Sequence, residues 1–260
     1  MRVAGIQHDI VWEDGASTRA HIAPLVASAV SDGAELVLLP EMFATGFSMH
    51  TERIAEAPDG PTTEFLRTAA ADHRCWIGGT VALHTDDARA TNSFVLAGPN
   101  GELHRYDKMH PFTHAGEHEH YAAGSGPVVV TVAGLRIALF VCYDLRFADD
   151  FWDLAPSVDC YLVPANWPRV RREHWNTLLR ARAIENQAWV VGVNRVGRVG
   201  SLEYSGDSAI IDPFGAVVAS APGPADDGVG PEAIVLAEVD PGRVAAIRSE
   251  YPFLADRTRR

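Results

Sequence analysis

The chain has 260 residues, of which 47% are hydrophobic and 22% charged, a globular composition that excludes a disordered, collagen-like or coiled-coil protein. Its formal net charge of −12 disfavours binding to nucleic acid, because neutralising phosphate groups requires a basic surface. Its three scattered cysteines, Cys75, Cys142 and Cys160, do not fit a disulfide framework or a zinc knuckle, and they indicate reduced thiols in a cytoplasmic protein.

The hydrophobic segments predict no signal peptide and no membrane partner. Residues 1–9 lack the apolar stretch of a signal peptide and turn acidic at Asp9. The longest nearly apolar stretch, residues 128–142, contains Gly134 and Arg136 and is shorter than the roughly 20 residues that span a membrane. No linker, repeat or block of like charge divides the chain, so we expect one domain over residues 1–260.

Short runs rich in Val, Ile, Leu and Ala predict strands throughout the chain. Several runs are apolar on both faces, as in sheets that are covered on both sides. The predicted strands are Val3–Gln7, Glu35–Leu39, Cys75–Val81, Ser93–Ala97, Val128–Val132, Arg136–Val141, Cys160–Val163, Trp189–Val193, Ser208–Ile211, Val217–Ala219 and Ala233–Ala237.

Helical patterns lie between some of these strands. Ala16–Ser31 has apolar residues at helical spacing, although Pro24 argues against an unbroken helix. Thr63–His73 and Arg171–Gln187 also predict helices, and Asp240 followed by proline is typical of a helix N-terminus. Turn residues at 98–102 and 212–215 predict hairpins. The alternation predicts a layered α/β domain.

Two segments, Pro40–Pro61 and Asp107–Pro127, predict long loops, which are often functional in compact domains. Glu41 begins the first loop at the end of a buried strand, where α/β sheets commonly bind ligands. Lys108 begins the second, after the strand of a hairpin. Taken alone, each residue is more typical of a solvated surface charge.

Cys142 also ends a predicted strand. A thiol at such a turn lies near backbone N–H groups, which favour the thiolate and offer donors to an oxyanion. The alternative is a buried structural cysteine, as we expect for Cys75 and Cys160. A cysteine nucleophile needs a base, and a carboxylate assisted by an ammonium group can fill that role. The occurrence of Glu41, Lys108 and Cys142 after strands therefore indicates a catalytic group.

Three segments resemble the signature motifs of the nitrilase superfamily of carbon–nitrogen hydrolases, and the similarity continues through residues 205–208 and 212–215. The resemblance implies an αββα sandwich that pairs into a homodimer, a Glu–Lys–Cys triad at Glu41, Lys108 and Cys142, and no metal or other cofactor. The segments are Leu39-Pro40-Glu41-Met42-Phe43, Tyr106-Asp107-Lys108-Met109-His110 and Val141-Cys142-Tyr143-Asp144-Leu145-Arg146-Phe147.

The resemblance also implies a second glutamate between the lysine and the cysteine. Glu117 fits best, because Tyr121 and Gly124 follow it, and Glu119 is the alternative. The segments around Cys142 and Glu117 are most similar to the omega-amidase branch. That branch hydrolyses the terminal amide of α-keto-acid amides such as α-ketoglutaramate and α-ketosuccinamate.

The substrate-binding residues expected for such an enzyme follow the nucleophile. The backbone N–H of Tyr143 would stabilise the oxyanion together with Lys108. Arg146 is the candidate for binding the distal carboxylate, because a guanidinium forms two parallel hydrogen bonds with that group. An internal ion pair with Asp144 or Asp149 is the alternative for Arg146. Trp167 would line the pocket, although a core or surface position suits it nearly as well.

Other functions remain open at this stage. Four histidines of the second loop suggest a metal-dependent hydrolase, but Pro111 and Gly116 disfavour a regular helix there and no H-E-x-x-H motif accompanies them. A binding module without catalysis is disfavoured by the intact triad. Nitrilase, aliphatic amidase and N-carbamoyl amidase activities remain alternatives, because specificity lies in loops. The histidines are His110, His114, His118 and His120.

Overall fold

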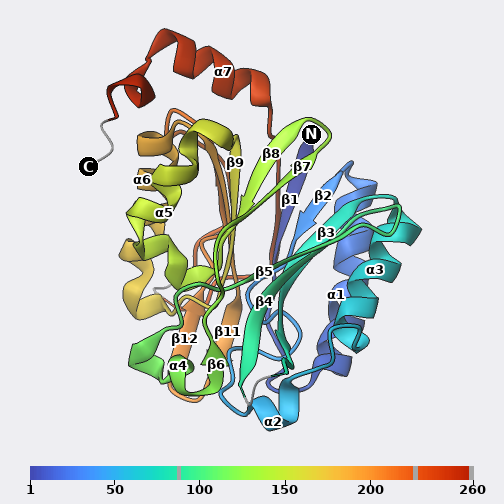
Figure 1. Ribbon diagram of the computed structural model, residues 1–260. Coiled ribbons are helices and arrows are strands. Elements are labelled where there is room, and N and C mark those ends of the chain that lie inside the picture. The colour runs from blue at the N-terminus through green and yellow to red at the C-terminus, as the bar shows by residue number, and fades with distance from the viewer. Residues whose placement is uncertain (87–88, 225–227, 258–260) are drawn as a thin grey trace.

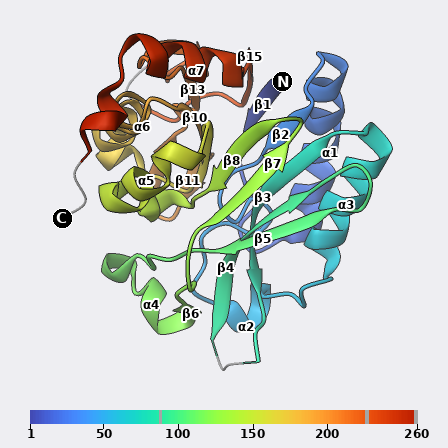
Figure 2. The ribbon, with the colours of Figure 1, turned by 45° about the horizontal axis from the view of Figure 1, so that its top comes forward.

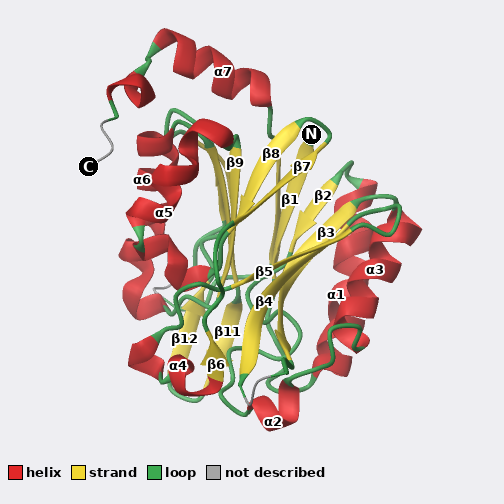
Figure 3. Ribbon diagram, in the orientation of Figure 1, coloured by secondary structure: helices red, strands yellow, loops and turns green. Residues whose placement is uncertain are grey.

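The computed structural model describes residues 1–86, 89–224 and 228–257. In Figures 1 and 3, two β-sheets face each other at the centre, and helices cover the outer face of each sheet. The predicted α/β class and the four-layer αββα arrangement are thereby confirmed.

The first sheet has parallel strands at its centre and a hairpin at one edge. β1, β2 and β3 run parallel, β15 lies antiparallel beside β1, and β4 and β5 continue from β3 as antiparallel neighbours. The short β6 also pairs with β4. In spatial order, the strands are β15 (Ala233–Glu238), β1 (Arg2–Gln7), β2 (Leu36–Leu38), β3 (Trp76–Leu83), β4 (Ala90–Ala97) and β5 (Leu103–Asp107), with β6 at Tyr121–Ala122.

The second sheet repeats this plan. β8, β9 and β10 run parallel, and antiparallel strands flank them on both sides. A separate hairpin pairs β11 (Val196–Val199) with β12 (Leu202–Ser205). In spatial order, the second sheet contains β14 (Val217–Ser220), β13 (Ala209–Ile211), β10 (Trp189–Asn194), β9 (Cys160–Ala165), β8 (Leu135–Leu139) and β7 (Val128–Val132).

The helices form the two outer layers. α1 (Gly15–Ser31) and α3 (Pro61–His73) cover the first sheet, whereas α5 (Ala148–Leu154) and α6 (Arg172–Asn186) cover the second. α7 (Pro241–Glu250) lies across one end, and Figure 2 shows α2 (Thr51–Ile54) and α4 (Glu117–His120) toward the opposite end. Short 3-10 turns lie at Thr113–Ala115, Cys142–Arg146, Ala155–Ser157, Arg169–Arg171 and Phe253–Asp256.

Apolar side chains between the layers hold the sandwich together. One cluster fills the space between the sheets, with Leu38 and Phe94 from the first sheet and Leu139 and Val191 from the second. Burial of this apolar area is the main favourable contribution to folding. Among the described residues, no helix combines the length and apolar character that a membrane crossing needs.

The structure corrects two expectations about elements. α1 is unbroken across Pro24, because the exposed proline lies on the solvent face while Ile22 and Val26 on the other face are fully buried. The hairpin of β11 and β12 was missed, since Arg198 and Glu203 interrupt its apolar pattern. β6, α2, α4 and α5 were likewise absent from the predicted elements.

Candidate active site

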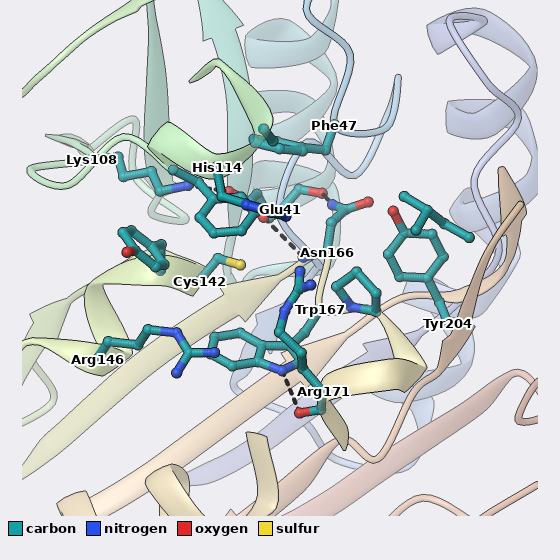
Figure 4. Close-up of a pocket in the computed structure, with 15 residues that line it drawn as sticks. Glu41, Phe47, Lys108, His114, Cys142, Arg146, Asn166, Trp167, Arg171 and Tyr204 are labelled. Atoms are coloured by element: carbon teal, nitrogen blue, oxygen red, sulfur yellow. Dashed lines mark hydrogen bonds and ion pairs between the residues drawn. The ribbon is translucent and has the colours of Figure 1, made fainter. Parts of the chain in front are cut away.

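The three triad candidates converge although they are far apart in sequence. Glu41 follows β2, Lys108 follows β5 and Cys142 follows β8, so both sheets contribute. Figure 4 shows their side chains around one pocket, which has a volume of about 280 Å³. The Lys108 Nζ lies 2.9 Å from Oε1 of Glu41, and the charges of Glu41 and Lys108 both act on the pKa of the Cys142 thiol. The structure therefore brings these three side chains together.

The backbone at the nucleophile candidate is strained. Cys142 has a φ of 45°, and Met42, which follows Glu41, has a φ of 44°. Left-handed conformations of non-glycine residues cost energy and are concentrated at functional sites. At Cys142 this conformation turns the chain sharply from the strand into the 3-10 turn Cys142–Arg146.

Asp144 holds that turn in place. Its Oδ2 accepts hydrogen bonds from the backbone N–H of Val141 at 2.9 Å and from the Tyr106 hydroxyl at 2.8 Å, and its Oδ1 accepts from the backbone N–H of His110 at 3.0 Å. Burial raises the pKa of Asp144 to about 6, so the carboxylate is ionised at neutral pH. Asp144 thus links the turn of the cysteine to the segment that carries Lys108.

Lys108 lies between two buried carboxylates. Its Nζ contacts Glu117 Oε2 at 2.8 Å and Glu41 Oε1 at 2.9 Å, and its side chain is 2% exposed. Burial alone lowers the pKa of Lys108, but the charges of Glu117 and Glu41 raise it well above its ordinary value. Lys108 is therefore a permanent ammonium ion whose three N–H donors face Glu41 Oε1 and both Glu117 oxygens, and a substrate oxygen would share one of these donors.

Asn92 on β4 reduces the repulsion between the two carboxylates. Its Nδ2 donates to Glu41 Oε1 at 2.8 Å and to Glu117 Oε1 at 3.1 Å. Asn92 was not predicted as a site residue, because it lies inside a strand and not at its end. The available signal was a run of polar residues, Thr91, Asn92 and Ser93, at the start of a strand that is buried throughout.

Asn166 fixes the other side of the Glu41 carboxylate. The backbone N–H of Asn166 donates to Glu41 Oε2 at 2.9 Å, and its side-chain amide donates to the Glu41 carbonyl oxygen. Asn166 directly follows β9, so the rule that selected Glu41 and Cys142, a polar residue at the end of an apolar strand, also points to Asn166. The carboxylate is held by three donors and aimed at the thiol.

The expectation that the turn favours a thiolate is wrong for the enzyme without substrate. Burial raises the pKa of the Cys142 thiol well above its ordinary value, and the negative charge of Glu41 raises it further. The charge of Lys108 offsets only part of this rise. The resting state at neutral pH is a neutral thiol beside a carboxylate, which is the state that base-assisted attack requires.

The second glutamate lies in the same cluster. Glu117, the first residue of α4, is fully buried and contacts Lys108, and its Oε2 also accepts a hydrogen bond from the backbone N–H of Phe112. Glu119, the alternative, is exposed to solvent on the same short helix. The geometry therefore favours Glu117.

The predicted substrate-binding residues form the outer part of the pocket. Tyr143, Arg146 and Trp167 all line the cavity. The Arg146 guanidinium lies 4.8 Å from the Trp167 ring centroid and contacts His174 Nδ1 at 3.1 Å. In the described part of the chain, Arg146 forms no ion pair with Asp144 or Asp149, the alternative considered for it.

Further lining residues were not singled out from the sequence. They come from several loops and from the hairpin of β11 and β12, and their placement depends on how those segments fold over the sheet ends. Besides Asn166, the chief ones are Phe47, Phe112, Arg171, Leu202 and Tyr204.

The histidines of the second loop are dispersed. His110 contacts Asp150 at 2.7 Å and stacks on Phe147, whereas His114 lines the pocket beside Phe112. Within residues 1–86, 89–224 and 228–257, no group of three or more His, Cys, Asp or Glu side chains could hold a metal ion.

Known proteins resemble the whole chain. The sequence model described as carbon-nitrogen hydrolase matches residues 2–249. The omega-amidase YafV of Yersinia enterocolitica is 40% identical over 259 residues, which cover 98% of this chain and 96% of that protein. The 2-oxoglutaramate amidase of Bacillus subtilis is 32% identical over 232 residues, which cover 87% of this chain and 86% of that protein. The crystal structure of a CN-hydrolase superfamily protein from Xanthomonas campestris, with an arsenic adduct in its active site, matches with a TM-score of 0.91 and 37% identity, covering 100% of this chain and 98% of that one.

Proposed function

The chain belongs to the carbon–nitrogen hydrolase family, and from that premise we propose that it is an omega-amidase, which hydrolyses the terminal amide of a short α-keto-dicarboxylate monoamide such as α-ketoglutaramate or α-ketosuccinamate. The observation that carries the proposal is one pocket that holds Cys142, Glu41 and Lys108 together with an arginine, Arg146, that has no acidic partner within the described residues.

Hydrolysis would proceed through a thioester. Glu41 accepts the thiol proton while the Cys142 sulfur attacks the amide carbon, and the oxyanion receives hydrogen bonds from Lys108 and from the backbone N–H of Tyr143. Such donors typically contribute a factor of about 100 to 1,000 each in rate. Glu41 then returns the proton to the nitrogen, and ammonia leaves. A water molecule that gives its proton to Glu41 hydrolyses the thioester, and the thiol is regenerated.

Glu117 would act by positioning Lys108. Its two oxygens lie 3.1 and 2.8 Å from Nζ, which holds the ammonium against the pocket wall. The distal carboxylate of the substrate would bind Arg146, with the Trp167 ring beneath the guanidinium.

Hydrolysis of a small set of nitrogen compounds tests the proposed function. We expect ammonia release to be fastest from α-ketoglutaramate, slower from succinamate, and much slower from L-glutamine and from a simple nitrile. Initial rates measured by coupled ammonia detection check this order. A nitrile or a neutral amide as the best substrate would assign the protein to another activity of the superfamily.

Replacing Arg146 by alanine tests the carboxylate site. Loss of a charge-assisted hydrogen-bonding partner is expected to lower kcat/KM for succinamate by about 10- to 100-fold and to leave a neutral amide such as propionamide nearly unaffected. The kcat/KM values for succinamate and propionamide are measured on the same enzyme preparation. An unchanged ratio between the two substrates would show that another group binds the carboxylate.

We also propose that the hydrolase domain spans residues 1–260 and acts as a cytoplasmic homodimer on small molecules, without nucleic-acid or membrane partners. A cysteine nucleophile must stay reduced, as the cytoplasm provides, and the net charge of −12 disfavours phosphate backbones. For the dimer, support comes from large apolar side chains exposed near one another on the α6 side, namely Ile184, Phe214 and Phe253.

A further inference from the structure

The pocket contains a second arginine whose charge is not balanced by the protein. Arg171, at the end of the 3-10 turn Arg169–Arg171, lines the cavity, and its guanidinium carbon lies 5.3 Å from the Phe112 ring centroid. Across residues 1–86, 89–224 and 228–257, the Arg171 side chain forms no ion pair with an Asp or Glu. Glu41, the one acid that lines the pocket in the described part of the chain, is already bonded to Lys108.

The arginines on either side of Arg171 are paired. Arg169 Nε lies 2.9 Å from Glu203 Oε2, and Arg172 Nη2 lies 2.6 Å from Asp207 Oδ1. Both acids belong to the segment around β12, so these pairs attach the turn to the neighbouring hairpin. Of these three arginines, Arg171 is the one that the structure directs to the catalytic pocket.

The position of Arg171 is fixed relative to Arg146. The Trp167 indole Nε1 donates to the Arg171 carbonyl oxygen at 2.8 Å, and the other guanidinium, that of Arg146, lies 4.8 Å from the centroid of the same indole ring. Figure 4 shows the two arginine side chains approaching Trp167 from different sides. The Arg146 guanidinium thus lies over the Trp167 ring and the Arg171 guanidinium over the Phe112 ring, and all four residues line the pocket that holds Cys142.

We propose that Arg171 is a second anion-binding residue, which together with Arg146 binds the α-keto acid end of the substrate and rejects the corresponding α-amino acid amide. The inference rests on the proposed omega-amidase function. A carboxylate and a neighbouring keto oxygen offer enough lone pairs for two guanidinium forks. An α-ammonium group at the same place would instead meet a like charge in a pocket partly shielded from water. This would distinguish α-ketoglutaramate from the abundant zwitterion glutamine.

Charge removal at Arg171 and at a paired neighbour provides a matched test. Arg171→Met removes the proposed contact, Arg171→Lys keeps the charge without the planar fork, and Arg169→Met removes the same charge from a surface pair next to the pocket. Each variant is assayed with α-ketoglutaramate and L-glutamine, and its melting temperature is compared with wild type.

We expect Arg171→Met to lower kcat/KM for α-ketoglutaramate by about 10- to 100-fold, mainly through KM, and to leave or raise the value for L-glutamine. The preference for the keto acid thus falls at least about tenfold. Arg171→Lys is expected to retain part of the preference, and Arg169→Met nearly all of it. An equal loss on both substrates, or the same loss in Arg169→Met, would overturn the inference.

A binding measurement separates this inference from the proposed function. In a Cys142→Ala background, calorimetry with the product α-ketoglutarate should show a dissociation constant about 10- to 100-fold larger when Arg171 is replaced by Met. Unchanged product binding would refute the role of Arg171 even if wild type hydrolyses α-ketoglutaramate. A wild-type enzyme that does not hydrolyse α-ketoglutaramate would refute the omega-amidase function, whichever residue binds the anion.

Discussion

Replacing Cys142 by alanine is expected to reduce ammonia release by more than about 10,000-fold while the protein stays folded. Without the sulfur no thioester forms, and the remaining donors cannot replace a nucleophile. The substitution removes one atom from the wall of an open pocket, so the free energy of unfolding should change by no more than about 1 kcal/mol. Initial rates with α-ketoglutaramate, together with thermal unfolding, check both expectations.

Cys75 supplies the control for this substitution. Its thiol is also buried, and burial raises its pKa to about 11, but it packs with the first sheet and its helices and does not line the pocket. Cys75→Ala should therefore lower stability more than Cys142→Ala and leave turnover per folded molecule unchanged. Mass spectrometry of the quenched wild-type reaction should show an acyl adduct that Cys142→Ala lacks. Near-normal activity of Cys142→Ala would refute the thioester mechanism.

Local sequence patterns were sufficient to predict the site residues that lie just after apolar strands. Glu41 and Cys142 each follow a run of buried residues, and strand order places both at the edge where the sheets meet the loops. Asn92 was not found this way, because it lies in the interior of β4 and its partners Glu41 and Glu117 are distant in sequence.

The position of Arg171 in the pocket could not be predicted from the sequence. Three arginines between residues 169 and 172 are typical of a solvated basic turn, and nothing in their order distinguishes them. Arg171 differs from its neighbours because Glu203 pairs with Arg169 and Asp207 with Arg172. Both acids lie in or next to β12, a strand that was not predicted. The resting state of Cys142 was misjudged for a related reason, since burial and then the charge of Glu41 raise the pKa of its thiol only once the chain is folded.

Replacing Glu41 by glutamine is expected to separate the charge of this residue from its role as a base. Turnover should fall by about 1,000- to 10,000-fold, because the amide accepts no proton from the thiol or from water. The negative charge of Glu41 raises the pKa of Cys142, so its removal should lower that pKa. Alkylation by iodoacetamide, measured from pH 6 to 10, should therefore begin at lower pH in Glu41→Gln than in wild type, although the variant is nearly inactive.

Glu117→Gln is the matched control. It also removes one negative charge that contacts the Lys108 ammonium, but it does not change the carboxylate beside the thiol. Its alkylation profile should move less than that of Glu41→Gln, whereas its turnover falls through a less firmly held Lys108. The opposite result, a Glu41→Gln thiol that reacts only at higher pH, would mean that Glu41 stabilises a thiolate indirectly and does not hold the thiol proton. Since a carboxylate next to a buried sulfur can only oppose a second negative charge there, a faster-reacting but inactive thiol is the outcome that identifies Glu41 as the base.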